Sequence, residues 1–324
     1  MKNHLYLPVI ACISSLLLID CAKASTDDQS SKNSVLLVNH NSGSLIALSG
    51  QSSSQMQTEA IKLEVHPVAY NNLGLGYVAL KEHQKAIANY TKVIELKSDD
   101  AAAYFKRGVA YIELQEYRKA IAEFTKAIKL QPDNASAYYN RGNAYIGLKE
   151  HQKAIADYTK AIQLQPDDAA AYSNRGVAYT ELKEYQKAIA DLNKAVELQP
   201  DDANAYYNRG NAYAELKEHQ KAIADYTKAI QLQPDYAPAY NNRGITYIQL
   251  KDYRKAIADF TKAIKLQPDF APAYFFRGFT YANLKNYQKA IADVQKATQL
   301  FYQQGEMEGY RLAQGLLREL QSNR

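Results

Sequence analysis

The sequence predicts an all-α protein built as an array of stacked helix pairs, and three observations support this. A block of 34 residues recurs seven times between Pro67 and Gln304. Within each block, small and aromatic residues recur at helical spacing. A Pro-Asp sequence separates most blocks from the next. A fixed period of this length is typical of stacked supersecondary units, none of which can bury its apolar face alone.

The expected domain organisation has four parts. Residues 1–24 form a signal peptide, residues 25–66 a flexible lead-in rich in Ser and Asn, and residues 305–324 a C-terminal capping helix. The repeats between them span 67–100, 101–134, 135–168, 169–202, 203–236, 237–270 and 271–304. Below, positions 1 to 34 are counted from the first residue of each unit.

The first 24 residues have the pattern of an export signal. Lys2 is followed by an apolar stretch from Leu5 to Ile19 and by the small-x-small sequence Ala22–Ala24. The stretch is short and interrupted, which disfavours a membrane span. The residues up to Cys21 also resemble a bacterial lipobox, although Asp20 stands where a small residue is expected. We expect a cleaved signal and a periplasmic or secreted protein, with a lipoprotein anchored at Cys21 as the alternative.

Bulk composition argues against several classes of function. The net charge of +5 over 324 residues is too mild to suggest a nucleic-acid binder. Cys12 and Cys21 are the two cysteines, so the rest of the chain has no disulfide, thiolate metal site or cysteine nucleophile. The sequence contains no phosphate loop, nucleophile elbow or metal-binding pair. We therefore expect no enzyme, no cofactor and no metal.

The lead-in has a polar composition that favours flexibility. Two apolar runs in it, Val35–Val38 and Leu45–Leu48, are the basis of an alternative in which they form a small hairpin. A lone hairpin is marginally stable, so disorder or loose docking is favoured. Ala60–Leu63 echoes Ala127–Leu130, so a degenerate repeat that caps the first unit is a further interpretation.

Each unit carries the residues of two antiparallel helices. Tyr at 4, Gly at 8 and Tyr at 11 share one face of a first helix, and Ala at 20, a ring or Leu at 24 and Ala at 27 share one face of a second. Gly at 8 and Ala at 20 permit close approach, and larger residues there would overpack the contact at about 1–3 kcal/mol. Pro at 32 ends the second helix, and the Asp that follows caps the next first helix.

These residues resemble the tetratricopeptide repeat, with Tyr in place of its usual Trp. The residues of the second unit that match its pattern are Tyr104, Gly108, Tyr111, Ala120, Phe124, Ala127 and Pro132. The resemblance implies an α-solenoid, a right-handed superhelix of seven helix-turn-helix units whose first helices line a concave groove. The terminal units depart from the pattern, with Ser98 in place of Pro in the first and Phe301-Tyr302 in place of Gln-Pro in the seventh.

The segment after Gly305 is expected to form an amphipathic helix that covers the end of the stack. The apolar residues that predict it are Met307, Tyr310, Leu312, Leu316, Leu317 and Leu320.

Positions 2, 5, 6, 9, 12 and 13 form a second face of the first helix, and amides and rings recur on it. The candidate peptide-binding residues there are Asn72, Phe105, Lys106, Tyr139, Asn140, Asn143, Asn174, Tyr207, Asn208, Asn211 and Asn242. A carboxamide offers both a donor and an acceptor, as the backbone of an extended peptide does. This row resembles the asparagine ladders of helical-repeat proteins that bind extended segments. The alternative is that these asparagines are solvated or bond from unit to unit.

The other recurring charges are interpreted as parts of the scaffold. Arg at 7 is expected to form a half-buried ion pair with an acid at 23, in its own or the neighbouring unit. Lysines at 19 and 26, such as Lys153 and Lys160, are expected to be solvated and supported by the position-23 acids. His83, His151 and His219 occupy position 17 of alternate units, too far apart to share one metal.

The sequence therefore predicts an exported, non-enzymatic scaffold that binds a protein or an extended peptide in its groove, in envelope complex assembly. Two alternatives remain: an accessory subunit that positions an exported or membrane enzyme, and an envelope assembly protein anchored through a lipid on Cys21. We expect no nucleic acid and no small-molecule cofactor, with membrane contact only if Cys21 is lipidated. The sequence does not specify an oligomeric state.

Overall fold

The computed structural model of the protein describes residues 35–39, 44–48 and 67–322. The chain divides into two compact units, Met1–Tyr70 and Asn71–Arg324, which are considered separately. The expected signal peptide (1–24), the lipobox around Cys21 and the capping segment Ala60–Leu63 lie outside the described residues, as does most of the expected flexible lead-in.

The compact unit Met1–Tyr70 contains a two-stranded antiparallel sheet. Strand β1 (Val35–Asn39) pairs with β2 (Ser44–Leu48), and the register places Val35 opposite Leu48 and Asn39 opposite Ser44. The two apolar runs therefore form the hairpin that the sequence left as the less favoured alternative.

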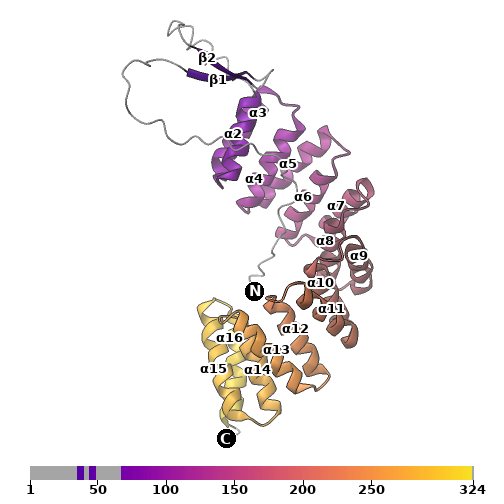
Figure 1. The fold of residues 1–324 in the computed structure, drawn as a ribbon, viewed down its shortest axis with the longest axis vertical. Helices are drawn as coiled ribbons and strands as arrows, with labels where there is room; N and C mark the ends of the chain where they lie inside the picture. The colour runs from indigo at the N-terminus through magenta and orange to yellow at the C-terminus, as the bar shows by residue number, and fades with distance from the viewer. Residues whose placement is uncertain (1–34, 40–43, 49–66, 323–324) are drawn as a thin grey trace, which may run out of the picture. The chain divides into compact units, whose positions relative to one another are not determined.

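The other regular elements of the described chain are helices joined by short turns (Figure 1). The first helices of the seven units are α2 (Pro67–Ala79), α4 (Ala101–Glu113), α6 (Ala135–Gly147), α8 (Ala169–Glu181), α10 (Ala203–Glu215), α12 (Ala237–Gln249) and α14 (Ala271–Asn283). The second helices are α3 (His83–Leu96), α5 (Tyr117–Leu130), α7 (His151–Leu164), α9 (Tyr185–Leu198), α11 (His219–Leu232), α13 (Tyr253–Leu266) and α15 (Tyr287–Gln303). A last helix, α16 (Met307–Ser322), follows them.

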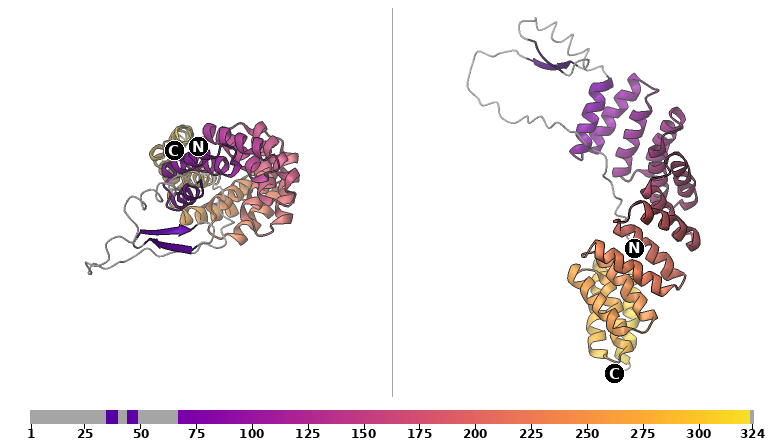
Figure 2. Two further views of the ribbon diagram at one scale, coloured as in Figure 1. Left: turned by 90° about the horizontal axis from the view of Figure 1, so that it is seen from above. Right: turned by 45° about the vertical axis from the view of Figure 1, so that its right-hand side comes forward.

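From α3 onward each helix packs against the next along the chain, which confirms the predicted α-solenoid of helix pairs (Figure 2). The array Asn71–Arg324 is a right-handed superhelix. First helices of neighbouring units from α4 to α14 also contact one another directly, and the second helices show no comparable contact. The first helices therefore lie on the inner side of the array.

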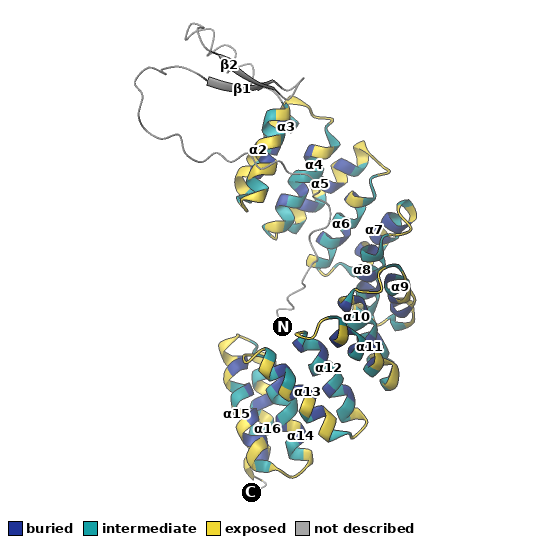
Figure 3. Ribbon diagram, viewed as in Figure 1, coloured by how far each residue is buried: buried dark blue, intermediate teal, exposed yellow. Residues whose placement is uncertain are grey.

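A narrow core runs along the array where the helix faces meet (Figure 3). A Cβ placed on Gly108 would lie 2.7 Å from the ring of Phe124, and one on Gly142 would lie 2.7 Å from the ring of Tyr158. The small residue at 8 thus makes room for the side chain at 24, as the sequence predicts. Ala at 20 and Ala at 27 are fully buried beside it in the described units, as Ala120 and Ala127 illustrate.

The loops between units cap the first helices in two ways. The side chains of Asp100, Asn134, Asp168 and Asp202 accept hydrogen bonds from backbone N–H groups of α4, α6, α8 and α10. Tyr236 and Phe270 stand at the same position before α12 and α14 and give no such bond. These two helices have a proline in their first turn instead, where the missing N–H costs nothing.

The turn within each unit depends on a left-handed residue that the sequence does not reveal. Position 15 has φ between 58° and 61° in all seven units, and it is Gln115 in the second unit and Lys in the others. The next residue bonds back over this turn, as Glu150 N–H does to the carbonyl of Tyr145 at 2.9 Å. Glycine usually occupies such a position.

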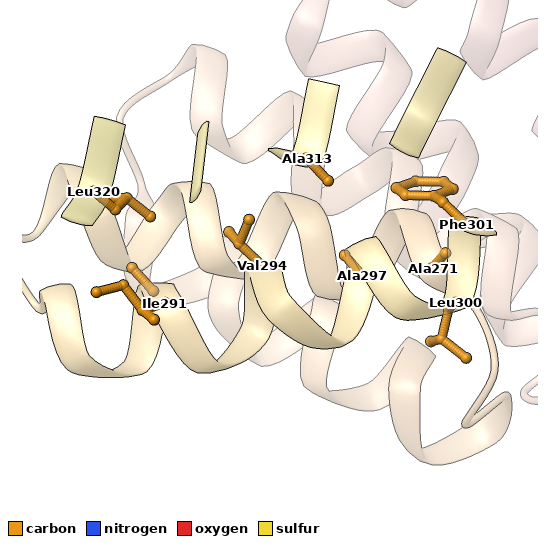
Figure 4. Close-up of a cluster of buried hydrophobic side chains, with 9 residues drawn as sticks. Ala271, Ile291, Val294, Ala297, Leu300, Phe301, Ala313 and Leu320 are labelled. Atoms are coloured by element: carbon orange, nitrogen blue, oxygen red, sulfur yellow. The ribbon is translucent and has the colours of Figure 1, made fainter. Parts of the chain in front are cut away.

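The C-terminal end of the array is covered by α16, as predicted (Figure 4). Its Ala313 and Leu320 are buried beside Ile291, Val294 and Phe301 of α15. With no proline at position 32, α15 runs for 17 residues instead of 14. The prediction that Met307 and Leu312 belong to the packed face is wrong, because both side chains are exposed.

Candidate functional site

The inner face of the array consists of positions 2, 5, 6, 9, 12 and 13 of the first helices. Position 6 is Asn in five of the seven units. The structure separates these asparagines into two kinds.

Asn174 and Asn242 are bonded to the unit before them. The Asn174 amide donates to the hydroxyl of Tyr139 at 2.9 Å and to Oδ1 of Asn143 at 3.1 Å. The Asn242 amide makes the same pair of bonds, to Tyr207 at 3.0 Å and Asn211 at 2.9 Å. Their donor groups are therefore used inside the array.

The buried tyrosines at position 24 complete these two clusters. The hydroxyl of Tyr158 donates to Oδ1 of Asn143 at 2.7 Å, and that of Tyr226 donates to Oδ1 of Asn211 at 2.8 Å. Burial raises the pKa of Tyr139 and of Tyr158. Both phenols therefore stay protonated, and the cluster carries no charge near neutral pH.

Asn140 and Asn208 have no partner in the unit before them. Asn140 follows a unit with Phe105 and Val109 at positions 5 and 9, and its amide donates instead to the backbone carbonyl of Ser136 at 2.8 Å. Asn208 follows a unit with Ser and Val at these positions, and its side chain makes no hydrogen bond within the described part of the chain. The Oδ1 atoms of both asparagines are therefore not used by neighbouring units.

Asn72 and Lys106, in the first two units, also interact locally. Lys106 Nζ donates to Oδ1 of Asn71 at 2.7 Å, and Asn71 lies 3.5 Å from Asn72. Burial lowers the pKa of Lys106, and the nearby Asp100 carboxylate opposes this shift. Lys106 is thus held against the scaffold.

The candidate rings at position 5 lie on the core rings of position 24. Phe105 is 5.7 Å from Phe124 between ring centroids, Tyr139 is 5.8 Å from Tyr158, and Tyr207 is 5.9 Å from Tyr226. Each candidate ring is half-buried. The core rings fix their positions, and Tyr207 also packs against Tyr236 with centroids 5.0 Å apart.

The predicted ion pairs between positions 7 and 23 are present in all six units that carry these residues. Arg141, for example, donates from Nε and Nη2 to the two carboxylate oxygens of Asp157 at 2.7 and 2.8 Å. Its Nη1 also donates to Thr125 of the preceding unit at 3.0 Å. The sequence analysis missed this third contact, although Thr or Asn recurs at position 25 wherever an Arg follows. The arginines do not point freely into the groove.

The lysines at position 19 have a different partner from the one predicted. Lys153 pairs with Glu150 at position 16, 2.6 Å away, and its Nζ lies 5.5 Å from the centroid of the Tyr145 ring. The position-23 acids do not support these lysines because Arg at 7 already occupies them.

We also searched residues 35–39, 44–48 and 67–322 for a histidine site, a metal site and a membrane span. His83, His151 and His219 each bury Nδ1 without a hydrogen-bond partner there. No group of three or more His, Cys, Asp or Glu in this part of the chain is arranged to hold a metal ion. No helix of the same residues is long and apolar enough to cross a membrane.

Comparisons with known families agree with this architecture. Models described as tetratricopeptide repeat match residues 135–168, 157–190, 203–236, 237–270 and 271–303, and a model described as TPR repeat matches 74–115, 110–149 and 178–217. Together these matches cover residues 74 to 303 without a gap. The chain belongs to the tetratricopeptide repeat family. Such a repeat fold is a scaffold for protein–protein interaction.

Solved structures with the same repeat include three that illustrate the likeness. A tetratricopeptide repeat protein from Parabacteroides merdae is 19% identical, with 79% of this chain and 98% of that chain covered and a TM-score of 0.62. PilW, described as a type IV pilus biogenesis factor, is 23% identical, with 65% and 97% covered and a TM-score of 0.59. YrrB, described as a TPR protein with an unusual peptide-binding site, is 28% identical, with 57% and 95% covered and a TM-score of 0.49.

The similarity to the Parabacteroides merdae protein and to PilW shows the fold of this chain. No curated protein sequence matches the chain significantly.

Proposed function

We propose that this tetratricopeptide repeat protein binds an extended peptide segment of a partner along its inner face, without catalysis. The observation that carries the proposal is the division of the position-6 asparagines. Asn140 and Asn208 keep acceptor groups that no neighbouring unit uses, whereas Asn174 and Asn242 are bonded to the scaffold. An extended backbone presents N–H and C=O groups at regular intervals that match such carboxamides.

The energetics require several units to act together. One hydrogen bond contributes about 0.5–1.5 kcal/mol net, and micromolar affinity needs about 8 kcal/mol. Asn140 and Asn208 cannot reach this value alone. The half-buried rings of Phe105 and Tyr139 would add apolar contact, since aromatic rings lose little conformational freedom on binding.

Paired variants of these asparagines test the proposal. We expect Asn140→Ala/Asn208→Ala to weaken peptide binding tenfold or more with an unchanged melting temperature. Asn174→Ala/Asn242→Ala removes four bonds between units and should lower the melting temperature, with a smaller direct effect on binding. Fluorescence polarisation measures the affinity for a peptide selected from a library on the full chain, and thermal unfolding measures the melting temperature. Equal affinity of the wild type and the first variant would remove the binding role.

We further propose that the scaffold acts outside the cytoplasm, in the assembly of an envelope complex. The basic start, apolar stretch and Ala22–Ala24 site of residues 1–24 support export. The mass of the mature N-terminus tests this, because cleavage after Ala24 leaves Ser25 as the first residue. A lipid on Cys21 is the alternative, and labelling with palmitate that disappears in Cys21→Ser would establish it.

A further inference from the structure

The inner face of α14, in the last unit, differs in chemistry from the inner faces before it. Five of its six positions are apolar, namely Pro272, Phe275, Phe276, Phe279 and Ala282. Phe279 is 38% exposed and is the one exposed large apolar side chain on the inner faces of α4 through α14. The amides of the middle units give way here to phenylalanines.

Two of these rings are fixed by the helices around them. The Phe276 ring stacks on Phe260 of α13 with centroids 6.1 Å apart, and Phe275 meets Phe276 edge to face at 5.3 Å. Phe275 also lies 6.5 Å from Phe301 of α15. Phe279 lies one helical turn further along the same face. A rigid aromatic surface of this kind loses little freedom when a ligand covers it.

Three acidic residues lie in the two segments that meet at the N-terminal end of α14. The side-chain amide of Gln304 donates to the backbone carbonyl of Asp269 at 2.7 Å, which places the turn after α15 beside the loop before α14. Glu306 and Glu308 follow in that turn and in the first turn of α16. Within the described part of the chain, none of the three carboxylates forms an ion pair. Lys285 lies beyond the other end of α14.

We propose that the inner face of α14 is an anchor site for a large apolar side chain of a bound peptide, and that a Lys or Arg beside this side chain pairs with the acidic rim of Asp269, Glu306 and Glu308. This proposal rests on the proposed peptide-binding function. It adds a chemical class for the partner and a direction along the array: the apolar and basic end of the segment lies on the seventh unit, and its remaining backbone lies toward Asn208 and Asn140.

Selection from a displayed library of random 12-residue peptides on the full chain tests this. We expect the enriched peptides to carry Phe, Leu, Ile or Met next to Lys or Arg. The affinity of the best peptide should fall about tenfold or more in Phe279→Ser, because a buried apolar side chain contributes at least that much. It should fall several-fold in Glu306→Gln/Glu308→Gln, and less so at 0.5 M salt, where charges are screened.

Leu250→Ser is the matched control, since Leu250 is 39% exposed, follows α12 and lies off the inner face. It should change the affinity less than twofold, and circular dichroism should show all variants to be folded. If peptides are enriched and Asn140→Ala/Asn208→Ala weakens them, but Phe279→Ser behaves like Leu250→Ser, the anchor site is wrong and the groove stands. If no peptide is enriched over an empty matrix, the proposed function fails as well.

Discussion

Asparagine at position 6 has two structural roles in one array, and the residues of the preceding unit decide between them. Asn174 and Asn242 follow units with Tyr at 5 and Asn at 9, so each finds two polar partners in reach. Asn140 and Asn208 follow units with Val at 9 and no Tyr at 5. The identity and position of an asparagine therefore do not decide its hydrogen-bonding role. The residues of the preceding repeat decide it.

At the same scale, the packing role of glycine at position 8 can be tested by substitution, with Gly76 of the first repeat as the control. A Cβ on Gly142 would lie 2.7 Å from the Tyr158 ring, which is fully buried and cannot retreat. We expect Gly142→Ala to lower the free energy of unfolding by about 1–3 kcal/mol. Gly76, also within a helix, has nothing within 4 Å of such an atom, so Gly76→Ala should stabilise the protein by up to about 1 kcal/mol.

Thermal unfolding of the two glycine variants measures this difference. A stabilising Gly142→Ala would mean that the helices separate without cost, contrary to the packing seen here.

At the scale of elements, Arg at position 7 joins three helices. Arg175 of α8 bonds to Asp191 of α9 with two nitrogens and to Thr159 of α7 with the third. The side chains of Arg175 and Asp191 are only 15% and 10% exposed, so the pair is more than a surface salt bridge. The first unit replaces both partners at once, with Leu73 and Asn89. The arginine and the acid are therefore present together or replaced together in every repeat.

That natural double replacement motivates a thermodynamic cycle. Arg175→Leu leaves the buried Asp191 carboxylate without its partner and should cost about 3–5 kcal/mol. Asp191→Asn should cost less, and the double variant should be more stable than the sum of the single changes predicts, by about 0.5–3 kcal/mol. Melting temperatures and urea unfolding of all four proteins give the coupling. Additive changes would show that the two side chains do not act together.

The sequence predicted contacts within one repeat better than contacts between neighbouring repeats. The helices, the Gly108–Phe124 contact and the Arg–acid pairs follow from positions within one 34-residue unit. The hydrogen bond from Arg141 to Thr125 joins two units and escaped prediction. The one from Asn174 to Tyr139 matches only the alternative in which the asparagines bond from unit to unit. The left-handed turn at position 15 also escaped, because a lysine gives no signal of a positive φ.

At the scale of the whole array Asn71–Arg324, the last unit is completed by a helix that is not itself a repeat. Tyr310, Leu316, Leu317 and Leu320 of α16 take the place that the first helix of a further unit would fill. Repeat arrays need such a cap because each unit buries its apolar face only against a neighbour. The cap also carries Glu308 in its first turn and directly follows Glu306, so stability and the proposed anchor site depend on the same element.

Two leucines of α16 separate the capping role from a general effect of the helix. Leu320 is 3% exposed in the cluster with Ile291, and Leu312 is 61% exposed and lies outside that cluster. We expect Leu320→Ala to cost about 2–5 kcal/mol, with a clear fall in melting temperature, and Leu312→Ala to stay within about 0.5 kcal/mol. Both changes keep the helix propensity high, so only packing distinguishes them. Similar losses from both would mean that α16 does not seal the array through the face described here.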